Sequence, residues 1–199
     1  MPGTWTRDIR PAMVLLALLT FTTGILYPLT VTATVQLLFP HEASGSLLIV
    51  DGKIVGSEWI GQPFDAPQYF WSRPSATGTV GYQAAASAGS NLGPLNPALA
   101  DAVRDRIARL RAASAPAPHQ PVPVDLVTAS ASGLDPHISP AAAEFQVARV
   151  ALARGFAERE VLELVQRHVE SRTWGILGEP RVNVLRLNRA LDAMVAFHP

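Results

Sequence analysis

The sequence predicts an α+β (mixed α/β) domain attached to one N-terminal transmembrane helix. Two observations carry this prediction. Residues 11–40 contain no charged residue, and the rest of the chain combines a hairpin signal with segments that begin at helix-capping residues. We therefore expect a short cytoplasmic N-terminus at residues 1–10, a transmembrane helix at 11–38 and a folded outer domain at 41–199.

The uncharged run is long enough to cross a bilayer, which takes roughly 20 apolar residues for about 30 Å of hydrocarbon. Arg7 and Arg10 lie just before the run, whereas Lys53 is the first Lys or Arg after it. This asymmetry predicts that the N-terminus is cytoplasmic and that residues 41–199 lie outside. A cleaved signal peptide is the alternative, but its apolar core of about 7–15 residues would be about half as long. The Thr-Ala-Thr stretch at 32–34 is also a poor cleavage site.

Small and hydroxylated side chains recur along the helix at spacings of three and four, which predicts one shared face. They are Thr20, Thr23, Gly24, Tyr27, Thr30 and Thr34. Such a face lets a second helix approach closely and hydrogen-bond, so we expect a partner-helix interface. The alternative is a face toward lipid, with each Thr bonded to its own backbone. Pro28 lacks an N–H and crowds the carbonyl of Gly24, which predicts a kink there.

The outer domain opens with a β-hairpin. Residues 47–50 and 53–55 flank Asp51-Gly52, a strong signal for a two-residue turn. Residues 56–97 are rich in Gly, Pro, Ser and aromatic residues. Aromatic side chains among turn residues indicate ordered loops that pack on a core.

Capping residues predict the helices that follow. Asn96 and Pro97 suit the cap and first turn of one helix. Ser139 and Pro140 begin a second helix, and Gly155 suits its C-terminal end.

A third helix is predicted over residues 157–172, and Asn183 suits the cap of a last helix. Residues 114–123 form a Pro-rich connector, predicted to be exposed and extended, and residues 124–128 predict a short strand.

Composition excludes several classes of function. The formal net charge is zero, so no overall basic field favours nucleic acid. The chain has no Cys, which excludes disulfides, thiolate metal sites and thiol catalysis. None of the five His residues has a convincing second ligand at helical spacing, so we expect no metal site.

Three polar features of the domain invite a functional hypothesis. Asp135, His137 and several Ser residues lie close together in sequence, but no G-x-S-x-G motif accompanies them, and such a loop is more often turn chemistry. The same loop precedes a helix start, which is a weak signal for anion binding. Arg73 lies close to Tyr69 and Trp71, which is typical of an arginine stacked on aromatic rings, either buried in the domain or at a partner interface. Gln146 and Arg149 share a helix face, which is typical of an exposed polar surface.

At the level of whole sequence words, the chain resembles the C subunit of the Kdp potassium-transporting ATPase. The matching words run from about residue 12 to 194. They are GILYPLTVT, QLLFP, ASGSLLIVDGKIVGSEWIGQPF, YFWSRPSA, SAGSNLGPLNPAL, PVPVDLVTASASGLDPHISPAAAEFQVARVALARG and LGEPRVNVLRLNRAL. Ala88 and Ala131 stand where the family usually has Gly, which costs some backbone freedom but leaves the resemblance intact.

The resemblance implies an accessory subunit, without hydrolytic activity of its own, of an ATP-driven potassium uptake complex. The implied location is the bacterial inner membrane, with residues 41–199 in the periplasm. The implied partners are a channel-like A subunit, a P-type ATPase B subunit and a small F subunit. No intrinsic cofactor is implied, and ATP would enter through the B subunit.

Two roles follow from the resemblance. In one, the subunit raises the ATP affinity of the ATPase subunit as a catalytic chaperone, and the residues carried over are Ser130, Ser132, Gly133 and Gln146. In the other, the helix docks on the A subunit and the domain lies near the potassium entrance. The predicted topology favours the second role, because ATP is cytoplasmic. A membrane-anchored envelope enzyme and a nucleotide-binding chaperone outside a potassium transporter remain the alternatives.

Overall fold

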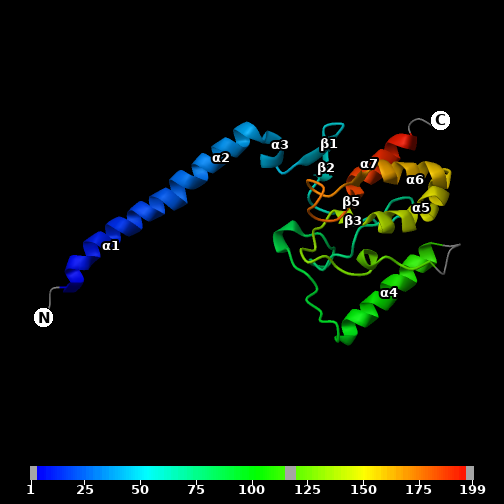
Figure 1. Ribbon diagram of the computed structural model, residues 1–199, viewed down its shortest axis with the longest axis horizontal. Helices are drawn as coiled ribbons and strands as arrows, with labels where there is room; N and C mark the ends of the chain where they lie inside the picture. Colours follow the sequence, from blue (N-terminus) through cyan, green and yellow to red (C-terminus); the bar gives the residue numbers. More distant parts are fainter. Residues whose placement is uncertain (1–3, 115–119, 196–199) are drawn as a thin grey trace. The chain divides into compact units, whose positions relative to one another are not determined.

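The computed structural model of the chain describes residues 4–114 and 120–195 (Figure 1). The chain forms two compact units, Met1–Leu47 and Leu48–Pro199. The middle of the predicted Pro-rich connector, residues 115–119, lies outside the described residues.

The first unit is helical throughout most of its length. Helix α1 (Thr4–Phe21) continues through a π-helical turn, η1 (Thr22–Leu26), into α2 (Tyr27–Leu38), and a short helix α3 (Pro40–Ala43) follows. In the described part of the chain, the segment Arg7–Leu38 is the one helix long and apolar enough to cross a membrane. The predicted α+β fold with one such N-terminal helix is confirmed.

The π turn lies one turn before Pro28. The N–H of Tyr27 bonds the carbonyl of Thr22, five residues back. Pro28 offers no N–H to the carbonyl of Gly24 and its ring would crowd that oxygen, so a wider turn relieves the clash. The extra residue turns α2 by roughly 100° relative to an uninterrupted α-helix. The predicted interface residues therefore form two groups on adjoining faces: Thr20 with Thr23 and Gly24 of the turn itself, and Tyr27, Thr30 and Thr34 after it.

The second unit begins with the predicted hairpin. Strands β1 (Leu47–Val50) and β2 (Lys53–Ser57) pair in a two-stranded sheet. Asp51 and Gly52 adopt φ values of 49° and 75°, the left-handed conformations that this tight turn requires.

A second sheet has three short antiparallel strands in the order β3-β5-β4: β3 (His137–Ile138), β5 (Arg181–Asn183) and β4 (Val169–Glu170). Val182 in the central strand is opposite Ile138 on one side and Val169 on the other.

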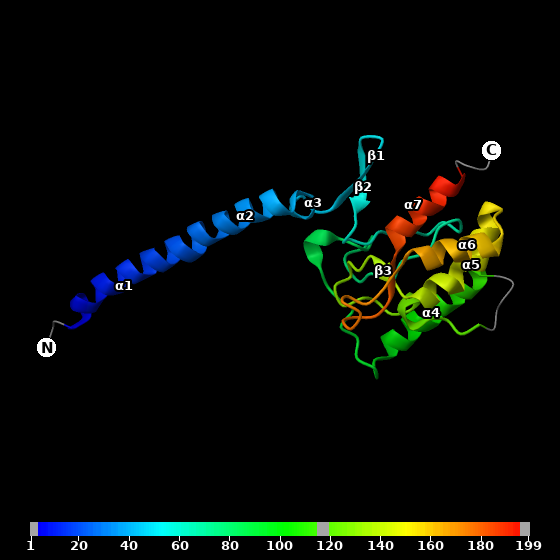
Figure 2. The same cartoon turned by 45° about the horizontal axis from the view of Figure 1, so that its top comes forward.

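Helices provide most of the regular secondary structure of the domain (Figures 1 and 2). They are η2 (Ala84–Ala86), α4 (Pro97–Ala113), η3 (Val124–Leu126), α5 (Pro140–Arg154), α6 (Glu158–Arg167) and α7 (Val184–Val195). Helix α6 packs against both α5 and α7. The side chains of Asn96, Ser139 and Asn183 each accept a backbone N–H from the first turn of α4, α5 and α7, which confirms the three predicted caps. Gly155 ends α5 with a φ of 70°, also as predicted.

The predicted strand at residues 124–128 is wrong, because this segment forms the single turn η3. The N–H and the Oγ1 of Thr128 both bond the carbonyl of Val124, which closes a helical turn. The same turn aims the carboxylate of Asp125 at Ser139, where it accepts both the backbone N–H and the hydroxyl.

The core lies between α5, α6, α7 and the three-stranded sheet. Its fully buried members include Phe70, Val150, Val161, Leu187 and Leu191. Phe70 comes from the loop region 56–97, so these loops pack on the core as predicted.

Residues 67–71 follow a turn closed by the N–H of Tyr69 on the carbonyl of Ala66 and bring Phe70 into this core. They pair with no strand in the described part of the chain, and side chains bond their backbone instead. The amide of Asn188 accepts the N–H of Phe70 at 2.8 Å and donates to its carbonyl at 3.0 Å. The amide of Gln146 does the same for Trp71, at 2.7 and 3.2 Å. We call this pair of contacts the amide clamp.

Arginines of α5 complete the hold on the segment. Arg149 donates to the carbonyls of Pro67 and Tyr69 and lies over the ring of Trp71 at 4.3 Å. Arg154 donates to the carbonyl of Gln68 and lies over the ring of Tyr69 at 4.8 Å. Burial lowers the pKa of Arg149 to about 10, which leaves it charged at neutral pH.

Replacing Gln146 by Ala should destabilise the domain by about 2–4 kcal/mol, because the buried N–H and carbonyl of Trp71 and one donor of Arg149 lose their partner. Urea unfolding of the detergent-solubilised chain, followed by tryptophan fluorescence, measures this. Gln166→Ala, an exposed position on α6, is the matched control and should cost less than about 0.5 kcal/mol. Equal effects of the two substitutions would show that the amide clamp contributes nothing.

Candidate functional site

Two neighbouring segments, 73–77 and 82–89, meet the distant loop 130–135. The hydroxyl of Ser75 donates to the carbonyl of Gly133 at 2.6 Å and accepts the N–H of Tyr82 at 2.8 Å. The N–H of Ala88 donates to the carbonyl of Ser132 at 3.1 Å. Segments 73–77, 82–89 and 130–135 therefore form one polar assembly, which we call the loop junction.

Close approach of these backbones explains two glycines. Gly133 has a φ of 67°, and a Cβ at this position would collide with the methyl group of Thr77 and lie 2.6 Å from the carbonyl oxygen of Ala88. A Cβ on Gly89 would lie 2.9 Å from the carbonyl oxygen of Ala131. Glycine is thus needed at positions 133 and 89 because the neighbouring backbones pack closely there.

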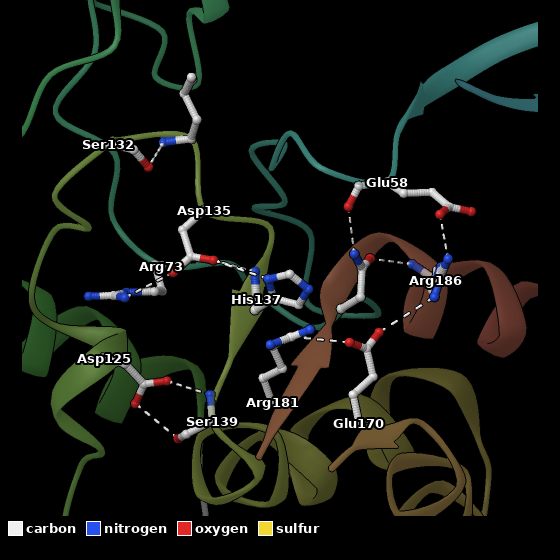
Figure 3. A network of polar contacts seen from close by, with 12 residues as sticks. Glu58, Arg73, Asp125, Ser132, Asp135, His137, Ser139, Glu170, Arg181 and Arg186 are labelled. Carbon is white, nitrogen blue, oxygen red and sulfur yellow. Dashed lines mark hydrogen bonds and ion pairs between the residues drawn. The ribbon is translucent and has the colours of Figure 1, made fainter. Parts of the chain in front are cut away.

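Asp135 is the charged centre of the junction (Figure 3). Its carboxylate accepts hydrogen bonds from Arg73 Nη1 at 3.0 Å and from the backbone N–H of His137 at 3.0 Å. The carboxylate also lies 3.3 Å from His137 Nδ1. Burial opposes ionisation of Asp135, but the hydrogen bonds from His137 and the charge of Arg73 outweigh it and lower its pKa. Arg73 is thus an ion-pair partner, and the arginines that stack on Trp71 are Arg109 and Arg149. The predicted stacking of Arg73 is wrong.

The arrangement of Asp135 and His137 lacks a nucleophile. Ser139, the nearest serine in sequence, bonds Asp125 and caps α5. Within the described residues, the hydrogen bonds of His137 run to Asp135 and none runs to a serine hydroxyl. The geometry is that of an anchored loop.

The four residues carried over for nucleotide binding have different surroundings. Ser130 is buried and its N–H bonds Pro74, whereas Ser132 is exposed and its hydroxyl accepts the N–H of Leu134. Gly133 lies in the junction. Gln146 is 0% exposed, and its amide makes four hydrogen bonds, to Trp71 twice, Ala142 and Arg149, which is its full capacity.

A cleft of about 320 Å³ lies beside the junction, and none of these four residues lines it. Trp71, Arg73, Tyr82, Arg106 and Arg109 are among its lining residues. Each arginine already has a partner, because Arg106 donates to the carbonyl of Val127 and Arg109 pairs with Asp65. Burial raises the pKa of Tyr82 to about 12, so its hydroxyl stays protonated and donates to the carbonyl of Arg73.

A second network ties the hairpin to the sheet and α7 (Figure 3). Arg186 pairs with Glu58, at the end of β2, and with Glu170 in β4. Glu170 also pairs with Arg181 in β5 at 3.1 Å. Asn183 donates to the carbonyl of Glu58 at 2.8 Å.

The helical unit carries the other predicted site. Thr23, Thr30 and Thr34 each donate their hydroxyl to the carbonyl four residues earlier, at 2.7–2.8 Å. The hydroxyl proton of each Thr is therefore engaged within the helix, an arrangement that suits the lipid-facing alternative as well as a partner helix. The predicted partner interface stays a prediction.

Sequence reasoning missed Asn188 and misjudged Gln146 and Arg149, which it placed on an exposed face. The available signal was a polar residue amid apolar neighbours at helical spacing, such as Asn188 between Leu187 and Leu191. No group of His, Asp and Glu suited to a metal ion occurs among residues 4–114 and 120–195.

These features define a class: a membrane-associated protein with one N-terminal apolar helix and a small mixed α/β domain held by side-chain networks. A sequence model of the KdpC family, K+-transporting ATPase c chain, matches residues 9–193. A relative from Sorangium cellulosum, named potassium-transporting ATPase KdpC subunit, is 64% identical over 92% of this chain and 96% of its own length.

Further relatives of the same name agree with this match. Those from Polaromonas naphthalenivorans and Burkholderia mallei are 61% and 59% identical, over 94% and 95% of this chain and 94% and 97% of their own lengths. The chain belongs to the KdpC family of potassium-transporting ATPase subunits, as the sequence words predicted.

Replacing Gly133 by Ala should destabilise the domain by about 3–5 kcal/mol, because a left-handed backbone and a collision with Thr77 and Ala88 act together. Gly155→Ala is the matched control. Gly155 has the same kind of φ, 70°, but nothing lies within 4 Å of an added Cβ, so only about 1–2 kcal/mol should be lost. Urea unfolding of both variants measures the difference. If the two losses are equal, close packing at the junction is refuted.

The lowered pKa of Asp135 predicts a pH dependence. A carboxyl whose pKa is lowered by folding stabilises the domain above its unfolded pKa, about 3.9, and this stabilisation is lost as pH falls below that value. Wild type should therefore exceed Asp135→Asn in unfolding free energy at pH 7, and the gap should narrow below about pH 4. Asp101→Asn, which breaks an exposed pair with Arg104, should show little gap at any pH. A gap for Asp135→Asn that stays constant between pH 7 and 3 would contradict the assignment.

Proposed function

We propose that this chain is an accessory subunit, without catalytic activity of its own, that supports assembly and stability of a potassium-transporting ATPase complex. In this proposal the N-terminal helix docks on a channel-like A subunit, beside a P-type ATPase B subunit and a small F subunit. The folded domain lies in the periplasm, near the side from which potassium enters. The pattern of small and hydroxylated residues on the helix carries the proposal.

The geometry of the helix supports docking. Gly24 lies within the π turn and has only a Thr20 methyl group near the position of a Cβ, at 4.0 Å, so a partner helix can approach closely there. The neighbouring Thr hydroxyls are satisfied internally, so contact with a partner helix requires no hydrogen bond to be broken. Irregular turns of this kind are common where transmembrane helices serve a function.

The domain supports an assembly role over a nucleotide role. Gln146 has no free hydrogen-bonding group for a ligand, and the residues of the Ser-Gly loop bond one another and neighbouring loops. The proposed periplasmic location also removes the domain from cytoplasmic ATP. An influence on the ATP affinity of the B subunit would then pass through the membrane helices. An envelope enzyme is disfavoured because the side-chain partner of His137 is Asp135, and no serine hydroxyl of residues 4–114 and 120–195 bonds its ring.

Replacing Gly24 by Leu should reduce co-purification of the chain with the detergent-solubilised ATPase complex by at least about tenfold, which corresponds to about 1.4 kcal/mol. The reason is that the added side chain holds the partner helix away. Thr32→Leu adds bulk two residues from both Thr30 and Thr34, on the opposite side of the helix, and should leave co-purification unchanged. Full retention of the Gly24→Leu variant, with normal potassium-stimulated ATP hydrolysis, would exclude this interface.

A reporter at the C-terminus tests the orientation. Alkaline phosphatase fused after Pro199 should be active in intact cells, because it folds only outside the cytoplasm, and fused β-galactosidase should be inactive. Exchanging charge across the helix, with Arg7 and Arg10 changed to Ser and Arg placed at His41 and Glu42, should weaken this asymmetry. Strong β-galactosidase activity of the unaltered chain would place the domain in the cytoplasm and defeat the proposed orientation.

A further inference from the structure

The loop between β4 and β5 carries an exposed apolar turn, residues 173–177. Trp174 is 85% exposed, Ile176 74% and Leu177 51%. Exposed apolar side chains also occur singly, for example Leu152 on α5 at 75%. In the 173–177 turn, three large ones fall within four consecutive residues.

The turn has a well-defined backbone. Thr173 and Leu177 exchange two backbone hydrogen bonds, both of 2.9 Å, and the N–H of Gly175 bonds the carbonyl of Arg172 at 3.0 Å. Arg172 pairs with Glu179 at 2.7 Å across its base. Trp174 adopts a φ of 54°, a conformation that residues with a side chain rarely occupy. The backbone thus holds a large aromatic ring out in the solvent at some cost, which calls for an apolar partner.

The size of this apolar surface bears on what the partner is. One Trp, one Ile and one Leu expose on the order of 400 Å². A stable protein–protein interface buries about 800 Å² on each partner. Trp together with aliphatic side chains is, however, the composition that favours the boundary between lipid head groups and acyl chains. The size and composition of the turn therefore favour a lipid surface.

The chain itself brings a lipid surface within reach. Residues 39–46 join the apolar helix to the domain and span at most roughly 28 Å when extended. The helix α3 within them shortens that span further. A domain of this length has a radius of gyration of about 15 Å. A sphere of this radius of gyration is about 39 Å across, so turns on the linker side of the domain can reach the bilayer in which the helix is embedded. The loop that carries the 173–177 turn follows Glu170, which shares Arg186 with Glu58, just after the hairpin that the linker enters.

We propose that the 173–177 turn is a second membrane anchor, which inserts Trp174, Ile176 and Leu177 into the head-group boundary of the bilayer. The helix fixes the chain in the membrane at one point, and the turn restricts rotation of the domain about that point. This goes beyond the assembly role, because it requires a lipid bilayer but no other subunit.

The absence of Cys allows a direct test in the full-length chain. A spin label is placed at Ile176→Cys, or at Leu152→Cys as the equally exposed control, and the chain is reconstituted alone into vesicles of phosphatidylethanolamine and phosphatidylglycerol. Collision rates are measured with oxygen, which concentrates in hydrocarbon, and with a nickel chelate, which is confined to water. The ratio of oxygen to nickel collisions should be at least about fivefold higher at position 176 than at 152.

The other outcomes overturn the proposal. Equal ratios at the two positions would mean that the turn lies in water. Low collision rates with both reagents at position 176 would mean that protein covers it. Adding Trp174→Ser and Leu177→Ser to the Ile176→Cys chain should lower the ratio to the value at 152, and an unchanged ratio would show that the label enters lipid by itself. Near-ultraviolet circular dichroism checks that this variant keeps its fold.

Discussion

The outer domain depends on how the backbone of Phe70 and Trp71 is satisfied. A buried N–H or carbonyl without a partner costs about 1–3 kcal/mol, and this segment has no neighbouring strand. Asn188 from α7 and Gln146 from α5 each bond both polar groups of one residue. The amide clamp therefore satisfies these backbone groups as the neighbouring strand of a β-sheet would. It also joins two helices to a loop that lies 75 or more residues earlier in the sequence.

The loop junction depends on this clamp. Once Trp71 is fixed, the next residues have little freedom, and Arg73 and Ser75 reach Asp135 and Gly133. Two of the sequence segments typical of the family, residues 69–76 and 121–155, thus form one connected set of contacts. The residues of these segments meet requirements of packing and hydrogen bonding, so the segments identify the family without identifying a bound ligand.

Local signals predicted much of this fold, because their causes are local. The Asp51-Gly52 turn and the caps at Asn96 and Ser139 depend on residues within one turn of the chain. The clamp could not be predicted in this way, since Gln146 finds its partner 75 residues away. For the same reason the sequence did not distinguish Gln146 and Arg149 from an exposed polar face. The membrane helix was predicted from composition, but the rotation introduced by the π turn follows from the conflict between Pro28 and Gly24.

The buried guanidinium of Arg149 holds the loop 67–71 in one conformation and is costly to bury. Burial lowers the pKa of Arg149 to about 10, so the protein bears a desolvation cost to keep a guanidinium between two carbonyls and the ring of Trp71. An apolar side chain at this position would avoid that cost but would leave the carbonyls of Pro67 and Tyr69 without these donors. Fixing the loop in one conformation thus outweighs the cost of the buried charge. The guanidinium of Arg149 keeps this arrangement although its Nε has no partner among the described residues, and a loop fixed in this way suits the accessory role proposed above.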